Sequence, residues 1–256
     1  MQTGAITPTI DVAQVVLYAF WIFFAGLVTY LLRENKREGY PLESDRSARA
    51  PRVPIQGWPS IPSPKTYLLR DGSSVSVPRP ASAPAPLSAR PSGPWPGAPL
   101  VPDGDPMQAG VGPGSYAERA DVPDTTLDGA PRLLPLRVLA GFGVDHGDPD
   151  PRGLPVIGAD GAVAGTVTEL WVDQAEMLFR YLEVALPQGP SVLLPINFAR
   201  IDDHRVRVRS LCADQFAGVP ALRVPDRVTL LEEEKIMAYF GAGTLYATPD
   251  RQEPLL

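Results

Sequence analysis

VAQVVLYAFWIFFAGLVTYLL, residues 12–32, is the stretch that decides how this 256-residue chain is organised. Its 21 residues carry no charge and lie between Asp11 and Arg33. A helix of this length spans about 31 Å, which matches the hydrocarbon core of a bilayer. A signal peptide would have a basic start and a shorter apolar run. We therefore expect residues 12–32 to form a retained transmembrane helix.

The charges beside this helix predict its orientation. Residues 1–11 contain no lysine or arginine, whereas Arg33, Lys36 and Arg37 follow the helix. Because positive charges are retained on the cytoplasmic side, residues 1–11 are expected to be periplasmic and the bulk of the chain cytoplasmic. One helix with few polar residues cannot form a transport path, so we interpret it as an anchor or docking element.

Proline dominates the segment that follows, since 16 of the 31 prolines lie in residues 41–106. Proline lacks a backbone N–H and fixes φ, which predicts an extended surface segment over residues 33–117. The turn signal Asp71-Gly72 predicts a small hairpin over residues 66–78. Apolar islands within the segment favour chain laid over a partner's surface, and a disordered linker is the alternative.

The second half is a distinct acidic unit, because residues 118–256 carry a net charge of −8 and residues 1–117 a net charge of +2. We expect an acidic β-barrel domain over residues 118–246 and a tail over 247–256. Short apolar and alternating segments predict its strands. These comprise a hairpin of 154–157 with 163–172, a strand at 181–186, a strand over 192–201 with Pro195 at an edge or bulge, and a strand at 205–209 with valines inside and arginines outside.

One helix is expected near residues 230–240. Thr229 and Glu232 have the spacing of a capping box, and Glu232 to Glu234 would occupy the first turn, where acids are favourable. Gly241 or Gly243 is expected to end the helix.

Composition excludes several classes of function. A net charge of −6 lacks the basic footprint of a nucleic-acid binder. The single cysteine, Cys212, rules out a disulfide framework and is expected to be a small buried side chain. The two histidines are near no recognisable nucleophile motif and leave little room for a metal site. The residues therefore predict a protein that is not an enzyme and holds no metal.

Asp173, Glu176 and Arg180 are the most interesting ionisable group. If a helical turn follows the strand that ends at Val172, both acids lie on one face and Arg180 lies one turn further on. Two acids near a cation can accept protons at separated pKa values, and burial against a membrane protein would raise one pKa toward neutrality. The alternative is a pair of acids that merely stabilises a helix N-terminus.

A series of short motifs, in order from end to end, resembles the H subunit of the photosynthetic reaction centre of purple bacteria. The motifs are Phe20-Trp21-Ile22-Phe23, Arg37-Glu38-Gly39-Tyr40-Pro41-Leu42, Pro64-Lys65-Thr66, Gly104-Asp105-Pro106-Met107, Gly110-Val111-Gly112-Pro113, Gly153-Leu154-Pro155-Val156, Leu170-Trp171-Val172-Asp173, Phe216-Ala217-Gly218-Val219-Pro220, Thr229-Leu230-Leu231-Glu232-Glu233 with Lys235, and Leu245-Tyr246-Ala247.

The resemblance implies one N-terminal transmembrane helix, an extended proline-rich segment, a mainly-β cytoplasmic domain of the PRC-barrel type, and one C-terminal helix. It implies the L and M subunits as partners, a surrounding light-harvesting antenna ring, membrane lipids, and a cytochrome subunit as a further candidate. L and M would hold the bacteriochlorophyll, bacteriopheophytin, carotenoid, quinones and non-haem iron, and this chain would bind no cofactor itself. The location would be the bacterial inner, or chromatophore, membrane. The chain would cap L and M, stabilise the quinone sites and conduct protons to the secondary quinone.

The resemblance also implies proton-transfer roles for specific side chains. Asp173 and Glu176 match the acids nearest the quinone pocket, and Arg180 matches the accompanying cation. Asp128 matches an acid near the proton entrance, and Glu233 matches an acid at the helix start, where capping is its alternative role. Some relatives carry His-x-His after the Asp-Gly pair, where this chain has Ala130, Pro131 and Arg132. Asp124 and Asp121 are therefore candidates for the surface acceptor.

A second hypothesis remains beside the first. The chain could be a membrane-tethered PRC-barrel module that recruits another protein or a ribonucleoprotein. Protection of the proline-rich segment from protease within an intact complex would favour the subunit hypothesis.

Overall fold

The computed structural model describes residues 4, 6–7, 11–42, 55–79, 87–95 and 97–252. The chain divides into two compact units. The first comprises Met1–Pro86 with Gly93–Ala98, and the second comprises Leu87–Ser92 with Pro99–Leu256. Each unit is described by itself.

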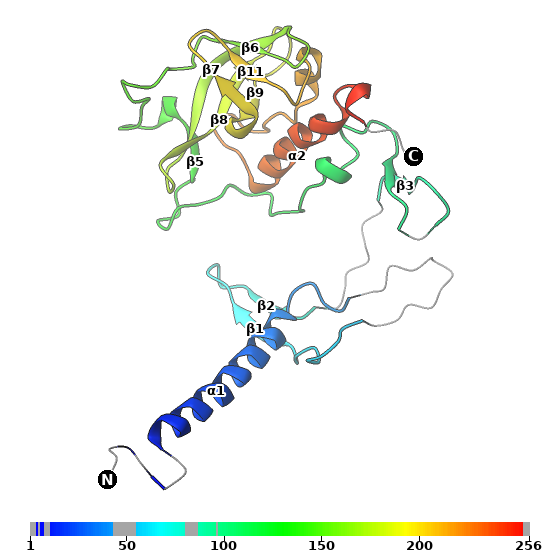
Figure 1. The fold of residues 1–256 in the computed structure, drawn as a ribbon. Coiled ribbons are helices and arrows are strands. Elements are labelled where there is room, and N and C mark those ends of the chain that lie inside the picture. The colour runs from blue at the N-terminus through cyan, green and yellow to red at the C-terminus, as the bar shows by residue number, and fades with distance from the viewer. Residues whose placement is uncertain are drawn as a thin grey trace. The chain divides into compact units, whose positions relative to one another are not determined.

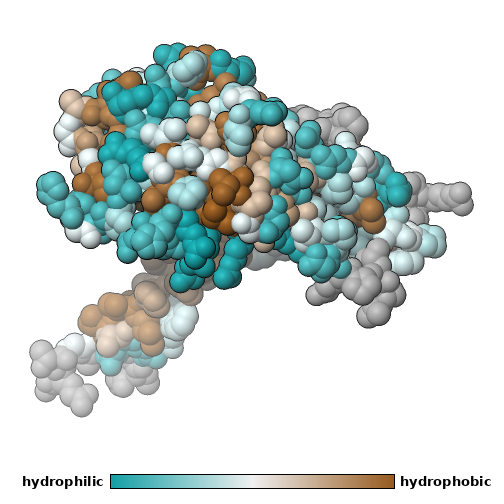
Figure 2. Space-filling model, turned by 90° about the horizontal axis from the view of Figure 1, so that it is seen from above, coloured by the Kyte–Doolittle hydropathy of each residue, from teal (hydrophilic) through white to brown (hydrophobic). Residues whose placement is uncertain are grey.

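Helix α1, Val12–Asn35, is the main element of the first unit (Figure 1). Asp11 caps it by accepting a hydrogen bond from the backbone N–H of Gln14 at 2.7 Å. None of its residues is buried, and it is long and apolar enough to cross a membrane. Large apolar side chains are exposed along it from Val12 to Leu32, and the face that Figure 2 shows is largely brown. The helix runs about one turn past the predicted end at Leu32.

Two basic residues fix the chain that follows α1. Lys36 is buried, and its ammonium donates to the carbonyl oxygens of Gln56, Gly57 and Pro59. Arg37 pairs with Glu34 at 2.7 Å and donates to the carbonyl of Ser63 at 2.8 Å. The end of the helix is therefore tied to residues 56–63 by charge-assisted hydrogen bonds.

The described part of the proline-rich segment contains two hairpins. The first pairs β1, Lys65–Leu68, with β2, Ser74–Val77, in the region where the sequence predicts one. Its turn uses Gly72 at φ +82°, and Asp71 accepts from the N–H of Ser73 at 2.9 Å. The second hairpin, β3 (Ala89–Pro91) with β4 (Leu100–Pro102), was not predicted. Residues 43–54 of the segment lie outside the described residues.

The second unit is built on a seven-stranded sheet in the order β10-β11-β6-β7-β8-β9, with β5 also paired to β7. All neighbours are antiparallel except β11 and β6, which are parallel. The strands are β5 Leu133–Pro135, β6 Pro155–Ile157, β7 Val163–Asp173, β8 Leu178–Ala185, β9 Val192–Pro195, β10 Ala199–Ile201 and β11 Val206–Val208. The prediction of a mainly-β domain is confirmed.

Helix α2, Leu230–Tyr246, packs with this sheet around one apolar core. Trp171, Phe216 and Phe240 are completely buried there. Val206 and Val208 face the core while the neighbouring arginines are exposed, as the alternating pattern predicts. Cys212 is buried and free. The capping box of Thr229 with Glu232 is also present.

Two sequence predictions are wrong in detail. The single strand expected over 192–201 is divided, because β9 ends at Pro195 and a 3-10 turn, Ile196–Phe198, precedes β10. Helix α2 continues through both Gly241 and Gly243. A Cβ at Gly241 would collide with the carbonyl of Pro113, and one at Gly243 with the carbonyl of Ser210. These glycines therefore permit close packing and do not end the helix.

Candidate functional site

The hairpin turn between β7 and β8 carries the acids that the sequence singles out. Asp173 ends β7, Leu178 begins β8, and Met177 lies between them at φ +57°. The expected helical turn is present as a single α-turn, because the N–H of Met177 donates to the carbonyl of Asp173 at 2.8 Å, but no helix follows and the chain reverses into β8. The turn still brings Glu176 within 2.9 Å of Arg180, which lies on β8.

Asp173 is a buried carboxylate held by two arginines. Both of its oxygens lie 2.9 Å from Nε of Arg132, and Oδ2 lies 3.2 Å from Nε of Arg180. Oδ1 also accepts from the N–H groups of Ala175 and Glu176, each at 3.0 Å. Burial would raise the pKa of Asp173, but Arg132 and the two backbone donors outweigh it and hold the pKa below its usual range. Asp173 is thus a fixed negative charge.

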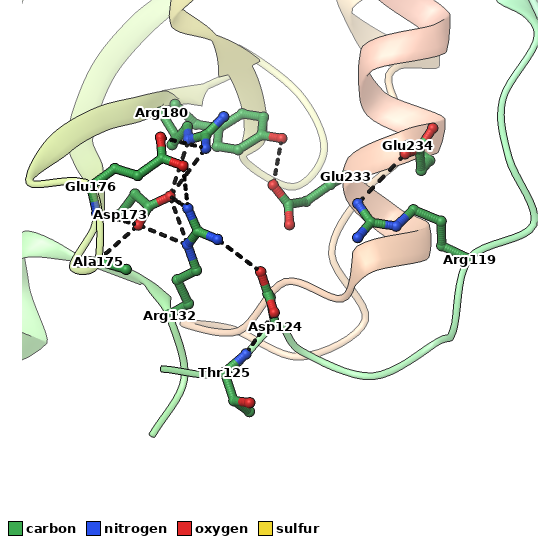
Figure 3. Close-up of polar contacts among 11 residues, drawn as sticks. Arg119, Asp124, Thr125, Arg132, Asp173, Ala175, Glu176, Arg180, Glu233 and Glu234 are labelled. Atoms are coloured by element: carbon green, nitrogen blue, oxygen red, sulfur yellow. Dashed lines mark hydrogen bonds and ion pairs between the residues drawn. The ribbon is translucent and has the colours of Figure 1, made fainter. Parts of the chain in front are cut away.

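Arg132 is the centre of the cluster, and the sequence analysis did not assign it a role. Its Nη2 lies 2.5 Å from Glu176, and its Nη1 lies 3.4 Å from Asp124 (Figure 3). The hydrogen bonds to Asp173 raise the pKa of Arg132, so the guanidinium stays charged. Arg132 directly precedes β5, and β5 pairs Leu133 with Asp173. Only this pairing of distant segments brings the two charges together.

Glu233, in the first turn of α2, accepts a hydrogen bond from the hydroxyl of Tyr181 at 3.0 Å. Burial raises the pKa of Glu233, although that hydrogen bond and the charge of Arg180 oppose the rise. Burial likewise raises the pKa of Tyr181. The acid of the capping box is Glu232, whose carboxylate accepts from the N–H of Thr229 at 2.9 Å. The side chain of Glu233 therefore contacts Tyr181 and takes no part in the capping box.

These side chains surround a small polar cavity of about 190 Å³. It has room for several water molecules, and its polar lining offers them hydrogen-bond partners. In Figure 3 the carboxylates of Asp124 and Glu233 are drawn on the other side of Arg132 from Asp173 and Glu176. The lining residues are Arg119, Asp124, Arg132, Leu133, Asp173, Glu176, Arg180, Leu230 and Glu233.

Models of two known families match this chain. Residues 4–138 match the model of the photosynthetic reaction centre H-chain N-terminal region, and residues 144–214 match the PRC-barrel domain. The first match alone covers just over half of the chain. The chain belongs to the photosynthetic reaction centre H-chain family. As a member of that family it is a membrane-anchored subunit that associates with the other reaction-centre subunits, and such subunits are generally non-catalytic.

The cavity of this H-chain family member draws on both matched regions. Asp124 and Arg132 come from the H-chain region, whereas Asp173, Glu176 and Arg180 come from the PRC barrel. Glu233 follows both regions along the chain. The cavity is therefore assembled where three parts of the sequence meet.

Two other acids from the sequence analysis lie apart from the cavity lining. Asp128 is exposed in a tight turn closed by a hydrogen bond from the N–H of Gly129 to the carbonyl of Thr126 at 3.0 Å. Its assignment to the proton entrance stays a prediction. Asp121 accepts from the hydroxyl of Thr229 at 2.8 Å and pairs with Arg223. Of the two surface candidates, Asp124 is the one that lines the cavity.

Proposed function

We propose that this H-chain family member caps the cytoplasmic face of the L and M subunits, stabilises their quinone sites and conducts protons to the secondary quinone. The observation that carries the proposal is the polar cavity in which a fixed carboxylate, an exposed carboxylate and a half-buried carboxyl of raised pKa occur together. Proton conduction needs groups of different proton affinity, joined by water or direct hydrogen bonds.

Each acid has its own part in this proposal. Asp173 stays ionised and lowers the energy of a positive charge in the cavity. Glu176, with its side chain 47% exposed, exchanges protons with solvent or with a partner subunit. Glu233 holds a proton more readily than an ordinary glutamate does, because it is half-buried. The hydroxyl of Tyr181 stabilises its carboxylate after the proton leaves.

The family match supports a proposal for the surroundings of the chain. The helix α1 would anchor the chain with residues 1–11 on the periplasmic side, and the barrel would lie in the cytoplasm. The pigments, quinones and non-haem iron would be held by L and M within an antenna ring in the chromatophore membrane. The quinone supplies the redox chemistry, and this chain contributes only protonatable groups.

The test is the light-driven reduction of the secondary quinone in complexes that carry Glu176→Gln, Glu233→Gln or both. We expect the second, proton-coupled electron transfer to slow at least tenfold in the double variant, with a smaller effect in each single variant. The first charge separation should not change. Asp203→Asn is the matched control, because it removes an exposed acid outside the cavity lining. Unchanged second-electron kinetics across pH in the double variant would refute the proposed path.

A further inference from the structure

A second cavity, of about 990 Å³, is a separate feature of the barrel unit and has no part in the proposed proton path. Residues of β10, β11 and the turn after β6 line it. Five of them are arginines, namely Arg200, Arg205, Arg207, Arg209 and Arg251, and no lining residue is acidic. In a chain with a net charge of −6, this is a concentrated positive region.

The pairing of β10 with β11 brings arginine charges close together, which is unfavourable unless other groups compensate them. Arg200 on β10 lies directly opposite Arg207 on β11 in the antiparallel pair. Like charges in directly opposed positions destabilise a sheet. Asp202 compensates in part, since it lies 3.5 Å from both Arg205 and Arg207. Arg200 and Arg209 form no ion pair with any residue that the structure describes.

Arg251 is fixed in the wall of the cavity without being neutralised. Its Nη1 donates to the carbonyl oxygens of Gly243 at 2.6 Å and Ser210 at 3.1 Å. Its Nη2 donates to the carbonyl oxygen of Arg209 at 2.8 Å. Carbonyl dipoles orient a guanidinium but leave its full charge. No carboxylate lies within ion-pair distance of Arg251 in the described ranges.

Ser210 gives an independent indication of a ligand. The residue lines the same cavity and is 4% exposed, and its Oγ has no hydrogen-bond partner among the described residues. Buried hydroxyl groups nearly always have a partner, so each exception calls for an explanation. Rotation of this side chain toward the cavity would bring the hydroxyl to an acceptor oxygen of a bound molecule and satisfy it.

We propose that this cavity binds a small molecule that carries at least two phosphate groups. The guanidinium fork matches two oxygens of a phosphate, which is why arginine is favoured for this recognition. One phosphate can engage only part of a five-arginine lining, so the count of charges favours a polyphosphate over the single phosphate of a common lipid headgroup. The volume lies at the upper end of the range for small-molecule sites.

The test is calorimetric titration of the full-length chain in detergent with three soluble probes. These are inorganic pyrophosphate, inorganic phosphate and glycerophosphoglycerol, which is the headgroup portion of a common anionic lipid. We expect pyrophosphate to bind at least tenfold more tightly than inorganic phosphate. Tighter binding of glycerophosphoglycerol would identify a lipid headgroup as the ligand and overturn the proposal, as would the absence of pyrophosphate binding.

Variants separate a built site from general attraction. Arg200→Gln with Arg209→Gln should weaken pyrophosphate binding at least tenfold. Arg90→Gln with Arg227→Gln removes the same charge from exposed positions outside the cavity lining and should leave the affinity unchanged. Equal weakening in both double variants would show non-specific attraction and overturn the proposal.

Ser210→Ala tests whether the Ser210 hydroxyl contributes to binding. This variant removes a buried hydroxyl that has no partner, so it should fold at least as stably as the parent chain in thermal unfolding. We expect it to bind pyrophosphate several-fold more weakly. An unchanged affinity in this stably folded variant would remove Ser210 from the site.

Discussion

Arg132 and Arg137 flank the short strand β5, and each pairs with acids of the β7–β8 hairpin. Arg132 contacts Asp173 and Glu176. Arg137 lies 2.8 Å from Glu183 and also pairs with Asp226. The two clusters therefore have similar chemistry, and they come from the same hairpin of the barrel.

Their surroundings differ. In the Arg137 cluster, the indole N–H of Trp171 donates to Glu183 at 3.0 Å, and the N–H groups of Arg137 and Leu170 donate to Glu169 at 3.1 and 3.0 Å. These donors keep their protons at neutral pH, so they hold the acids in place. The Arg132 cluster instead lines a polar cavity together with Glu233, whose pKa is raised. The two clusters therefore differ in the surroundings of their acids, and we expect proton transfer only in the cluster around Arg132.

Asp173→Asn should give the largest effect on stability. Removing one member of a buried ion pair costs about 3–5 kcal/mol, because the partner charge is left uncompensated. The side chains of Arg132 and Arg180 are 25% and 42% exposed, so solvent reduces this cost to about 2 kcal/mol. Urea unfolding of the full-length chain, followed by circular dichroism, measures the loss. A loss below about 0.5 kcal/mol would contradict a structural role for this carboxylate.

The same carboxylate predicts how stability depends on pH. The folded-state pKa of Asp173 lies below that of the unfolded chain, so its contribution is fully present above the unfolded value of about 3.9. It is lost as the pH falls through the folded value. Asp173→Asn should therefore make the free energy of unfolding fall less as the pH is lowered. A fall equal to that of the parent chain would contradict the lowered pKa of Asp173.

Glu183→Gln tests the same comparison in the cluster around Arg137. The variant weakens a charge-assisted hydrogen bond to Trp171 and an ion pair to Arg137, and we expect a loss of about 1 kcal/mol. The second electron transfer in the reaction-centre complex should keep its rate. A slowing comparable to that in Glu176→Gln would remove the distinction between the clusters.

Some of this architecture could be predicted because its causes are local. The charge-free run at residues 12–32 specifies α1, and the spacing of Thr229 and Glu232 specifies the start of α2. The alternation around Val206 and Val208 identifies the inward face of β11. In each case neighbouring residues decide the outcome, and the sequence shows them together.

The rest depends on contacts between distant segments. Arg132 meets Asp173 across 41 positions, through the pairing of β5 with β7. Gly241 and Gly243 resemble a helix end until Pro113 and Ser210 are seen to pack against them. No periodic pattern in the sequence encodes such contacts. The sequence alone therefore did not indicate Arg132 as the central cation of the site.

Glu233→Gln should have the smallest effect on stability. It also distinguishes the two acids, because the stability contributed by Glu233 and by Asp173 should change in opposite directions with pH. Burial raises the folded-state pKa of Glu233, so the folded chain loses stability as the pH rises from the unfolded value of about 4.3 through the folded value. Glutamine stays neutral and can still accept from Tyr181, so the variant should equal the parent near pH 4 and exceed it slightly at pH 7. Urea unfolding at both pH values measures this difference. If the variant were less stable than the parent by the same amount at both pH values, the result would contradict a raised pKa of Glu233 in the folded chain.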